Sequence, residues 1–209
     1  MANAIYANLQ RLQRQCLSHT ELKFILGGSE DSLYAKLKRA VANGLLIRIR
    51  RGLYYLAPPL AWEKPHPYVL AERIYGTSFI SLESALSYHG LIPEGVKVVT
   101  SVTARRRNYF KTSLGDYAYM TVPKKNFMLS VDRVVDGNAV YFMATPWRAI
   151  ADYVYCYKKN WSTIEPLVES LRMEPEEIPL LTPEEANELI EYYHQSRVTL
   201  FLLNALRRQ

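Results

Sequence analysis

Five basic residues and no acidic residue lie between Lys38 and Ala57, in the stretch KRAVANGLLIRIRRGLYYLA. The apolar residues of this stretch are regularly spaced, so we expect it to fold rather than to form a solvated charged tract. A folded segment with unneutralised positive charge can bind phosphate groups and release their counterions. The first chemistry that these residue types indicate is therefore the binding of a polyanion.

The charge of the whole chain is unevenly distributed in the same sense. Residues 1–57 hold nine Lys and Arg against three Asp and Glu, whereas residues 58–209 hold 17 of each kind, so the formal net charge of +6 lies in the first quarter. The remainder is polarised, with seven basic residues and one acid in 97–125 and nine acids and one basic residue in 165–191. This asymmetry predicts a polyanion-binding N-terminal module joined to a neutral body.

Local signals predict the helices of the N-terminal module. The apolar spacing predicts a first helix over residues 3–16, with Cys16 on its inner face. The capping box Ser18-His19-Thr20-Glu21 begins a second helix, which a glycine pair ends. Ser29 caps a third helix, which runs to about Asn43.

Two short alternating strands, LLIRIR and GLYYLA, follow the third helix and are joined at Arg50-Arg51-Gly52. Three helices and a hairpin in residues 1–57 predict a winged helix-turn-helix DNA-binding domain, in which the third helix is the DNA-reading element.

The candidate DNA contacts lie on the outer side of the third helix and on the hairpin. Those on the helix are Ser29, Ser32, Tyr34, Lys36 and Arg39. On the hairpin, Arg48 and Arg50 are expected to alternate outward, with Arg51 at the tip. Polar groups at the start of the helix can reach base edges, and the hairpin can neutralise phosphates. Two other interpretations stay open: a solvated basic face, and a winged helix that contacts only protein.

The chain beyond the hairpin divides into a linker and a body. Residues 58–67 form a proline-rich connector, and residues 68–209 read as an α+β domain. Its helices come first, an antiparallel sheet follows, and further helices end the chain. The predicted strands of this sheet are 96–103, 107–113, 117–122, 127–135 and 139–144.

Three groups of polar residues in the body could carry a function. Ser81, Glu83, Ser84 and His89 could form a polar site, but we favour a structural role in which Ser81 caps a helix and His89 ends it near the last carbonyls. Arg148 and Asp152 lie four residues apart on a helix and could pair, which would contribute about 0.3–0.5 kcal/mol if they were exposed.

The third group is Arg105, Arg106 and Arg107, which begin or precede a strand. Alternation along a strand would send neighbouring side chains to opposite faces. In a loop all three could touch phosphate. Contact with DNA or RNA and a plain solvated turn are equally good readings.

Four ordered blocks resemble one known family. These are GLLIRIRRGLYYLAP, SFISLESALSYHGLIPE, TSVTARRRNYF and ATPWRAIADYVY, and together they cover roughly residues 5–157. They are similar to the wing, central helix, basic strand and following helix of the AbiEi-type antitoxins of bacterial type IV toxin–antitoxin (AbiE) systems.

The resemblance implies a non-enzymatic transcriptional regulator of a phage-defence system. Such a protein represses its own promoter by binding double-stranded DNA, and it counteracts a nucleotidyltransferase-like toxin encoded nearby. Type IV action does not require a stable complex, so direct contact with the toxin is not implied. The C-terminal helices match the family only in character, and a homodimer is one possible assembly.

Two other classes of function remain as alternatives, a nucleic-acid-processing enzyme and a protein-interaction adaptor. The predicted sheet lacks the Asp and E-x-K pattern of a metal-dependent nuclease, and GxSxG, HExxH, GxGxxG and Walker-type loops are absent from the sequence. We therefore expect no catalytic residues, no cofactor and no metal. Cys16 and Cys156 have no CxxC partner and read as reduced thiols, and no apolar run approaches the length of a membrane span. The expected location is the cytoplasm.

Overall fold

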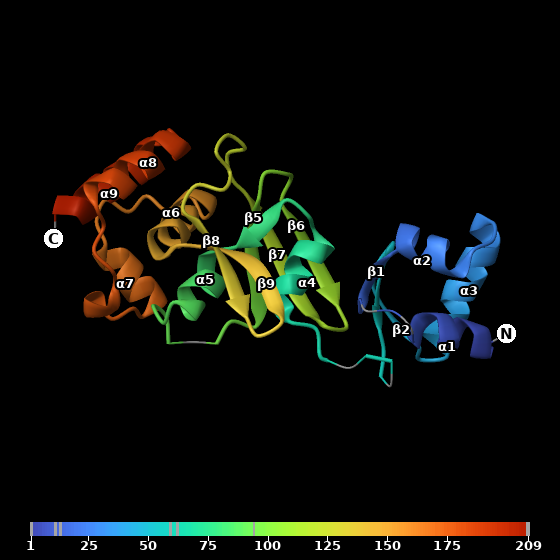
Figure 1. Ribbon diagram of the computed structural model, residues 1–209. Coiled ribbons are helices and arrows are strands. Elements are labelled where there is room, and N and C mark those ends of the chain that lie inside the picture. The colour runs from blue at the N-terminus through green and yellow to red at the C-terminus, as the bar shows by residue number, and fades with distance from the viewer. Residues whose placement is uncertain are drawn as a thin grey trace.

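The computed structural model describes residues 2–10, 12, 14–58, 60–61, 63–93 and 95–207 (Figure 1). The chain is an α+β protein with a helical C-terminus. Figure 1 shows an N-terminal lobe, from α1 to β3, beside a larger body, from α4 to α9. No helix in the described ranges is both long enough and apolar enough to cross a membrane.

The N-terminal lobe contains three helices and a small antiparallel sheet. The helices are α1 (Ala2–Gln10), α2 (His19–Leu26) and α3 (Glu30–Ala42). The strands are β1 (Cys16–Ser18), β2 (Leu46–Arg50) and β3 (Leu53–Leu56), in the order β1-β3-β2. The predicted second and third helices and both hairpin strands are therefore present within one or two residues of the expected bounds.

The predicted first helix is wrong in its second half. The helix ends at Gln10, residues 11 and 13 lie outside the described part of the chain, and Cys16 belongs to β1 instead. Cys16 pairs with Tyr55 of β3, and the Leu56 amide donates to the Gln15 carbonyl at 2.8 Å. This segment is extended because it satisfies backbone groups along the open edge of β3, which a helix in its place could not do.

A capping box begins α2, as the sequence predicts. The Glu21 amide donates to Ser18 Oγ at 3.2 Å, and the Glu21 carboxylate accepts from the Ser18 amide at 2.7 Å. The hydrogen bonds from the Ser18 amide and hydroxyl lower the pKa of Glu21. The carboxylate form of Glu21 therefore favours the folded state.

We expect Glu21→Ala to reduce the free energy of unfolding at neutral pH by about 0.5–1 kcal/mol, after solvent screening is allowed for. Because the folded pKa is lowered, this stabilisation is present above the ordinary value of 4.5 and is lost as pH falls through the folded value. Urea unfolding at neutral and acidic pH measures it, with the exposed Glu188→Ala as the control. A difference between wild type and Glu21→Ala that does not shrink on acidification would contradict this role.

The body is built on a six-stranded sheet. Its strands are β4 (Ser78–Ile80), β5 (Val98–Thr103), β6 (Asn108–Thr112), β7 (Gly115–Thr121), β8 (Val131–Asp136) and β9 (Ala139–Ala144). Their order across the sheet is β6-β7-β5-β4-β9-β8. The helices are α4 (Pro67–Ile74), α5 (Leu82–Tyr88), α6 (Pro146–Cys156), α7 (Glu165–Leu171), a 3₁₀ turn (Pro175–Glu177), α8 (Pro183–Tyr193) and α9 (Ser196–Arg207).

The prediction of an antiparallel sheet is wrong. β5 and β7 are parallel, and so are β4 and β9, so the sheet is mixed. Although β5 and β6 are consecutive, they do not pair, because β7 folds back between them and pairs with both. The sequence also gave no signal for β4, which has only three residues. The predicted strand over 127–135 is a turn up to residue 130 and a strand only from Val131.

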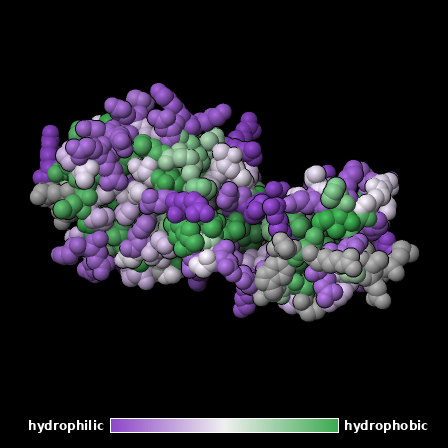
Figure 2. Space-filling model, viewed as in Figure 1, coloured by the Kyte–Doolittle hydropathy of each residue, from purple (hydrophilic) through white to green (hydrophobic). Residues whose placement is uncertain are grey.

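Two hydrophobic cores are present, and the β2–β3 hairpin contributes to both. Leu46, Tyr54 and Leu56 pack with the N-terminal helices. Ile49 and Leu53, together with Tyr55, belong to the core of the body. In Figure 2 the lobe and the body touch along a narrow waist. The hairpin is therefore held from two sides. Of the proline-rich linker, residues 59 and 62 lie outside the described ranges.

Candidate nucleic-acid interface

The hairpin and the start of α3 enclose a groove that is lined by both basic and acidic side chains. Arg48 and Arg51 are exposed on the hairpin side, and within the described residues neither forms an ion pair. The residues that line the groove are His19, Glu30, Asp31, Tyr34, Arg48, Arg51, Gly52 and Tyr54. The two arginines are thus free to meet phosphate groups.

Arg50 does not point outward, which corrects the expectation from alternation. Its Nε donates to the Ile74 carbonyl at the end of α4 at 2.7 Å, and its NH1 donates to the Arg51 carbonyl at 2.9 Å. The register of β2 against β3 shifts between Arg48 and Arg50, and such an irregularity re-aims the following side chain. Arg50 joins the hairpin to the body.

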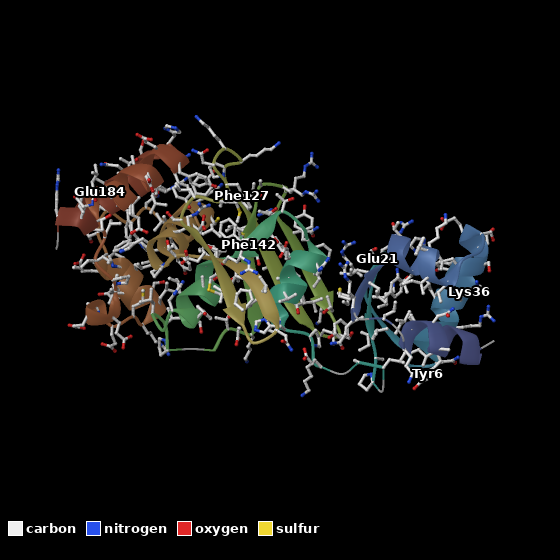
Figure 3. All side chains as sticks on the ribbon, viewed as in Figure 1. Tyr6, Glu21, Lys36, Phe127, Phe142 and Glu184 are labelled. Carbon is white, nitrogen blue, oxygen red and sulfur yellow. The ribbon has the colours of Figure 1, made fainter. Side chains whose placement is uncertain are left out.

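Lys36 is also engaged within the protein. Its Nζ donates to the carbonyls of Leu26 and Gly27 at 2.7 and 3.0 Å, where α2 ends. These carbonyls have no partner inside their own helix, so the ammonium group satisfies them. Figure 3 shows Lys36 on the side of the lobe away from the body. Lys36 fixes the turn between α2 and α3, and base contact would require it to give up two hydrogen bonds.

The remaining candidates on α3 are placed differently from one another. Ser29 caps the helix by accepting from the Ser32 amide at 3.3 Å. Tyr34 is 64% exposed, which is unusual for a tyrosine and leaves its ring free for contact. Arg39 is exposed, and its Nε donates to the Ala35 carbonyl at 3.2 Å. Ser32, Tyr34 and Arg39 remain candidates for contact with bases or backbone.

The first turn of α3 also carries two acidic residues, Glu30 and Asp31, which the predicted set of DNA contacts does not include. Glu30 pairs with Lys23 and with His19, whose Nε2 lies 3.0 Å away, and the hydrogen bonds from Lys23 and His19 lower its pKa. Asp31 forms no ion pair within the described residues. A carboxylate in a major groove can accept from the amino group of cytosine. Asp31 at the third position after the glycine pair was visible in the sequence as such an acceptor.

Arg105, Arg106 and Arg107 lie in the loop between β5 and β6, which decides between the two predicted placements. All three are exposed. The loop is anchored through its backbone, because Tyr75 donates to the Arg106 carbonyl at 3.0 Å and Thr121 to the Arg105 carbonyl at 2.8 Å. The arginine side chains are therefore left on the surface by a fixed backbone.

Further basic residues lie at the same edge of the sheet. β5 and β7 are parallel, so the loops that follow them are neighbours, and the Val122 amide donates to the Thr103 carbonyl at 3.0 Å. Exposed Lys124 and Lys125 follow the end of β7 after two intervening residues. We call Arg105, Arg106, Arg107, Lys124 and Lys125 the basic edge.

A chain of contacts joins the basic edge to the hairpin. Arg50 binds the carbonyl of Ile74, and the next residue, Tyr75, binds the backbone of Arg106. The guanidinium of Arg105 lies 5.9 Å from the centre of the Tyr75 ring. The hairpin residue Arg50 and the loop of Arg105 to Arg107 are therefore linked through consecutive residues at the end of α4, although more than 50 positions separate them in the sequence.

The polar block of Ser81, Glu83, Ser84 and His89 does not form one site. Ser81 stands at the start of α5, but its hydroxyl donates to Asp152 Oδ2 at 2.6 Å and makes no capping bond. Ser84 exchanges two hydrogen bonds with Thr100, which fix α5 to β5. His89 ends α5, as predicted, through its backbone amide, which donates to the Ala85 carbonyl at 2.9 Å, whereas its Nε2 lies 2.8 Å from the Ala144 carbonyl. These groups hold α5 in place.

Ser81 belongs instead to a network around a fully buried ion pair. Arg148 Nε lies 3.2 Å from Asp152 Oδ2, and both side chains have an exposed fraction of 0%. Tyr193 donates to Asp152 Oδ1 at 2.6 Å. The other guanidinium nitrogens donate to Tyr192 and to the Leu129 carbonyl. The predicted pairing of Arg148 with Asp152 is confirmed, but the pair is buried, so the energy given for an exposed pair does not apply. The network joins the start of α5 to α6 and α8.

Comparison with known proteins identified no family and no curated relative. No protein-family model matches the sequence, and no curated protein is similar enough to be counted as one. Among the described residues, no group of three or more His, Cys, Asp or Glu side chains is arranged to hold a metal ion.

Proposed function

We propose that this chain is a DNA-binding transcriptional repressor and antitoxin, as its resemblance to the AbiEi-type antitoxins implies. In this proposal the N-terminal lobe is a winged helix-turn-helix, with α3 as the recognition helix and the β2–β3 hairpin as the wing. It binds the promoter of its own operon and counteracts a nucleotidyltransferase-like toxin encoded nearby. The chain has no catalytic role in this proposal.

The observation that supports DNA binding most directly is the groove between α3 and the hairpin. Two exposed arginines, Arg48 and Arg51, which form no ion pair with any described residue, face a helix that presents an exposed aromatic ring and a carboxylate. Charge of this kind supplies affinity for any DNA, whereas Ser32, Tyr34 and Asp31 have the donors and acceptors that distinguish base pairs.

The basic edge extends the proposed interface onto the body. Arg105, Arg106 and Arg107 are assigned to the DNA backbone beside the wing, because their loop is bonded to Tyr75, and the carbonyl of the preceding residue, Ile74, is bonded to Arg50 of the hairpin. Lys36 and Arg50 keep supporting roles, since their donors are occupied by backbone carbonyls. Lys36 sets the orientation of α3, and Arg50 sets that of the wing.

The proposal is tested by the salt dependence of promoter binding. We expect Arg48→Ala with Arg51→Ala to reduce the slope of log affinity against log salt by about two units, because each lost phosphate contact contributes about 0.9. The ratio of promoter to scrambled-DNA affinity should stay nearly constant, since phosphate contacts carry no sequence information. Gel-shift titrations measure both quantities, with the exposed Arg133→Ala on β8 as the matched control.

The antitoxin half of the proposal is tested with the same variant. We expect the Arg48 and Arg51 double variant to lose repression of the promoter and still to restore growth of cells that express the toxin. An unchanged salt slope would remove the DNA interface from the hairpin. Failure of the wild-type chain to restore growth would remove the antitoxin role and leave a DNA-binding regulator.

A further inference from the structure

A cleft of about 410 Å³ lies where the N-terminal lobe meets the body. This volume is within the range of roughly 300–1,000 Å³ that is typical of small-molecule sites. Its walls come from the segment before β1, from β3, from the linker, from α4 and from the β8–β9 turn. The lining residues include Arg14, Tyr55, Glu63, Lys64, Val69 and Arg73.

One wall of the cleft is apolar. Tyr55 and Leu70 are buried, and Val69 is half-buried beside them. Burial raises the pKa of Tyr55 to about 12, and its hydroxyl donates to the Glu63 carbonyl at 3.2 Å. The polar end of Tyr55 is thus already satisfied, and the small exposed part of its side chain borders the cleft as apolar surface.

The rim of the cleft carries more positive than negative charge. Arg14, Lys64 and Arg73 face a single lining carboxylate, that of Glu63, which accepts from the Asn138 amide at 3.2 Å. Within the described residues Arg73 forms no ion pair. The side chain of Arg14 is 71% exposed, and its contact with a carboxylate just outside the cleft is long, at 3.4 Å. The side chains of Arg14 and Arg73 can therefore bind an anionic group without breaking a short internal ion pair.

The geometry points to this cleft as a binding site for a small organic anion, one with a carboxylate or a phosphate monoester attached to a ring. The ring lies against Tyr55 and Val69, and the anionic group meets Arg73 and Lys64. The same ligand changes the affinity of the chain for DNA. This second statement rests on the proposed function, whereas the first does not.

The reason for the coupling is that a ligand in the cleft touches both sides of the junction. The linker is tied to the lobe, since the Glu63 amide donates to Gln15 Oε1 at 3.4 Å. It is tied to the body by His66, which caps α4 and stacks on Tyr141 with ring centres 5.0 Å apart. Occupancy of the cleft therefore alters how the lobe is held, and the effects of ligand and DNA on one another must be reciprocal.

Titration calorimetry on the full chain without DNA tests the site. The probes are AMP for the phosphate monoester and salicylate for the carboxylate, with adenosine and inorganic phosphate as the neutral and ring-free comparisons. We expect AMP or salicylate to bind at least about tenfold more tightly than either comparison, because charge-assisted hydrogen bonds and ring contact act together. Binding by neither probe, or equal binding of the comparisons, overturns the site.

Variants locate the binding to the cleft. We expect Arg73→Ala to weaken binding of the better probe by about tenfold, and Lys64→Ala to weaken it less, because Lys64 is a flexible point charge. Arg133→Ala on β8 lies outside the cleft and should bind as wild type does. Circular dichroism confirms that each variant is folded. Unchanged binding by both Arg73→Ala and Lys64→Ala places the ligand elsewhere and overturns the assignment.

A final arm separates the two proposals. Promoter affinity of the wild-type chain is measured with and without a saturating concentration of the better probe. A change that Arg73→Ala removes supports the coupling, and an unchanged affinity overturns it. If the chain binds the probe but binds no promoter DNA, the proposed function fails and the ligand site stands.

Discussion

Replacing Asp152 with alanine should lower the free energy of unfolding by about 3–5 kcal/mol. The reason is that Arg148 would keep its positive charge in an environment where its exposed fraction is 0%, with no carboxylate to compensate it. Burial is the largest influence on the guanidinium and opposes its charged form, whereas the carboxylate of Asp152 favours it. Ser81 and Tyr193 would lose their common acceptor as well. Urea unfolding followed by circular dichroism measures the loss.

Two further variants separate the effect of an uncompensated buried charge from the loss of any carboxylate. Asp132→Ala removes an exposed carboxylate from β8 and should change stability by less than about 0.5 kcal/mol. Replacing both members of the buried pair, as Arg148→Met with Asp152→Leu, should recover much of what Asp152→Ala loses, since no uncompensated charge then remains. A cost for Asp152→Ala as small as that of Asp132→Ala would mean that Arg148 is solvated and not buried.

The second expected result is that residues 1–61, cut from the body, do not keep a stable fold. In the full chain Ile49, Leu53 and Tyr55 are only 5–6% exposed and belong to the core of the body. Each large apolar side chain returned to water costs about 1.5–3 kcal/mol, while a unit of this size has a total stability of only a few kcal/mol. The hydrogen bond from the Arg50 side chain to the Ile74 carbonyl would also be lost. Thermal melting and hydrogen exchange of the fragment measure the outcome.

This expectation revises what charge and periodicity alone suggest for the N-terminal residues. They contain three helices, a hairpin and all of the net charge, which describes a module that should fold by itself. A control in the full chain uses Leu53→Ala, which should cost about 2–5 kcal/mol, against Leu180→Ala at a 77% exposed position, which should cost almost nothing. A fragment that melts cooperatively at the melting temperature of the full chain would show that packing of Ile49, Leu53 and Tyr55 against the body does not stabilise the N-terminal lobe.

The sequence by itself determined those elements whose ends depend on hydrogen bonds between a few neighbouring residues. The capping box at Ser18, the cap at Ser29 and the glycine-containing turn after Arg51 each satisfy backbone groups within four residues, so α2, α3 and the hairpin could be predicted from sequence. The distribution of charge is likewise a property of the sequence alone. The charge distribution pointed to Arg48, Arg51 and Arg105 as candidate DNA contacts, and all three are exposed in the structure.

The tertiary structure alone decided which polar groups are free and which are occupied. Lys36 and Arg50 read as exposed cations, but their partners are backbone carbonyls, which every residue has and no sequence pattern distinguishes. The spacing of Arg148 and Asp152 predicted that they could pair but not whether the pair is exposed, and only the packing of α5, α6 and α8 removes it from water. The parallel pairing of β5 with β7 also depends on a strand that arrives later in the chain. Contacts between distant segments determine burial, and burial determines whether a charged side chain binds a partner or holds the fold together.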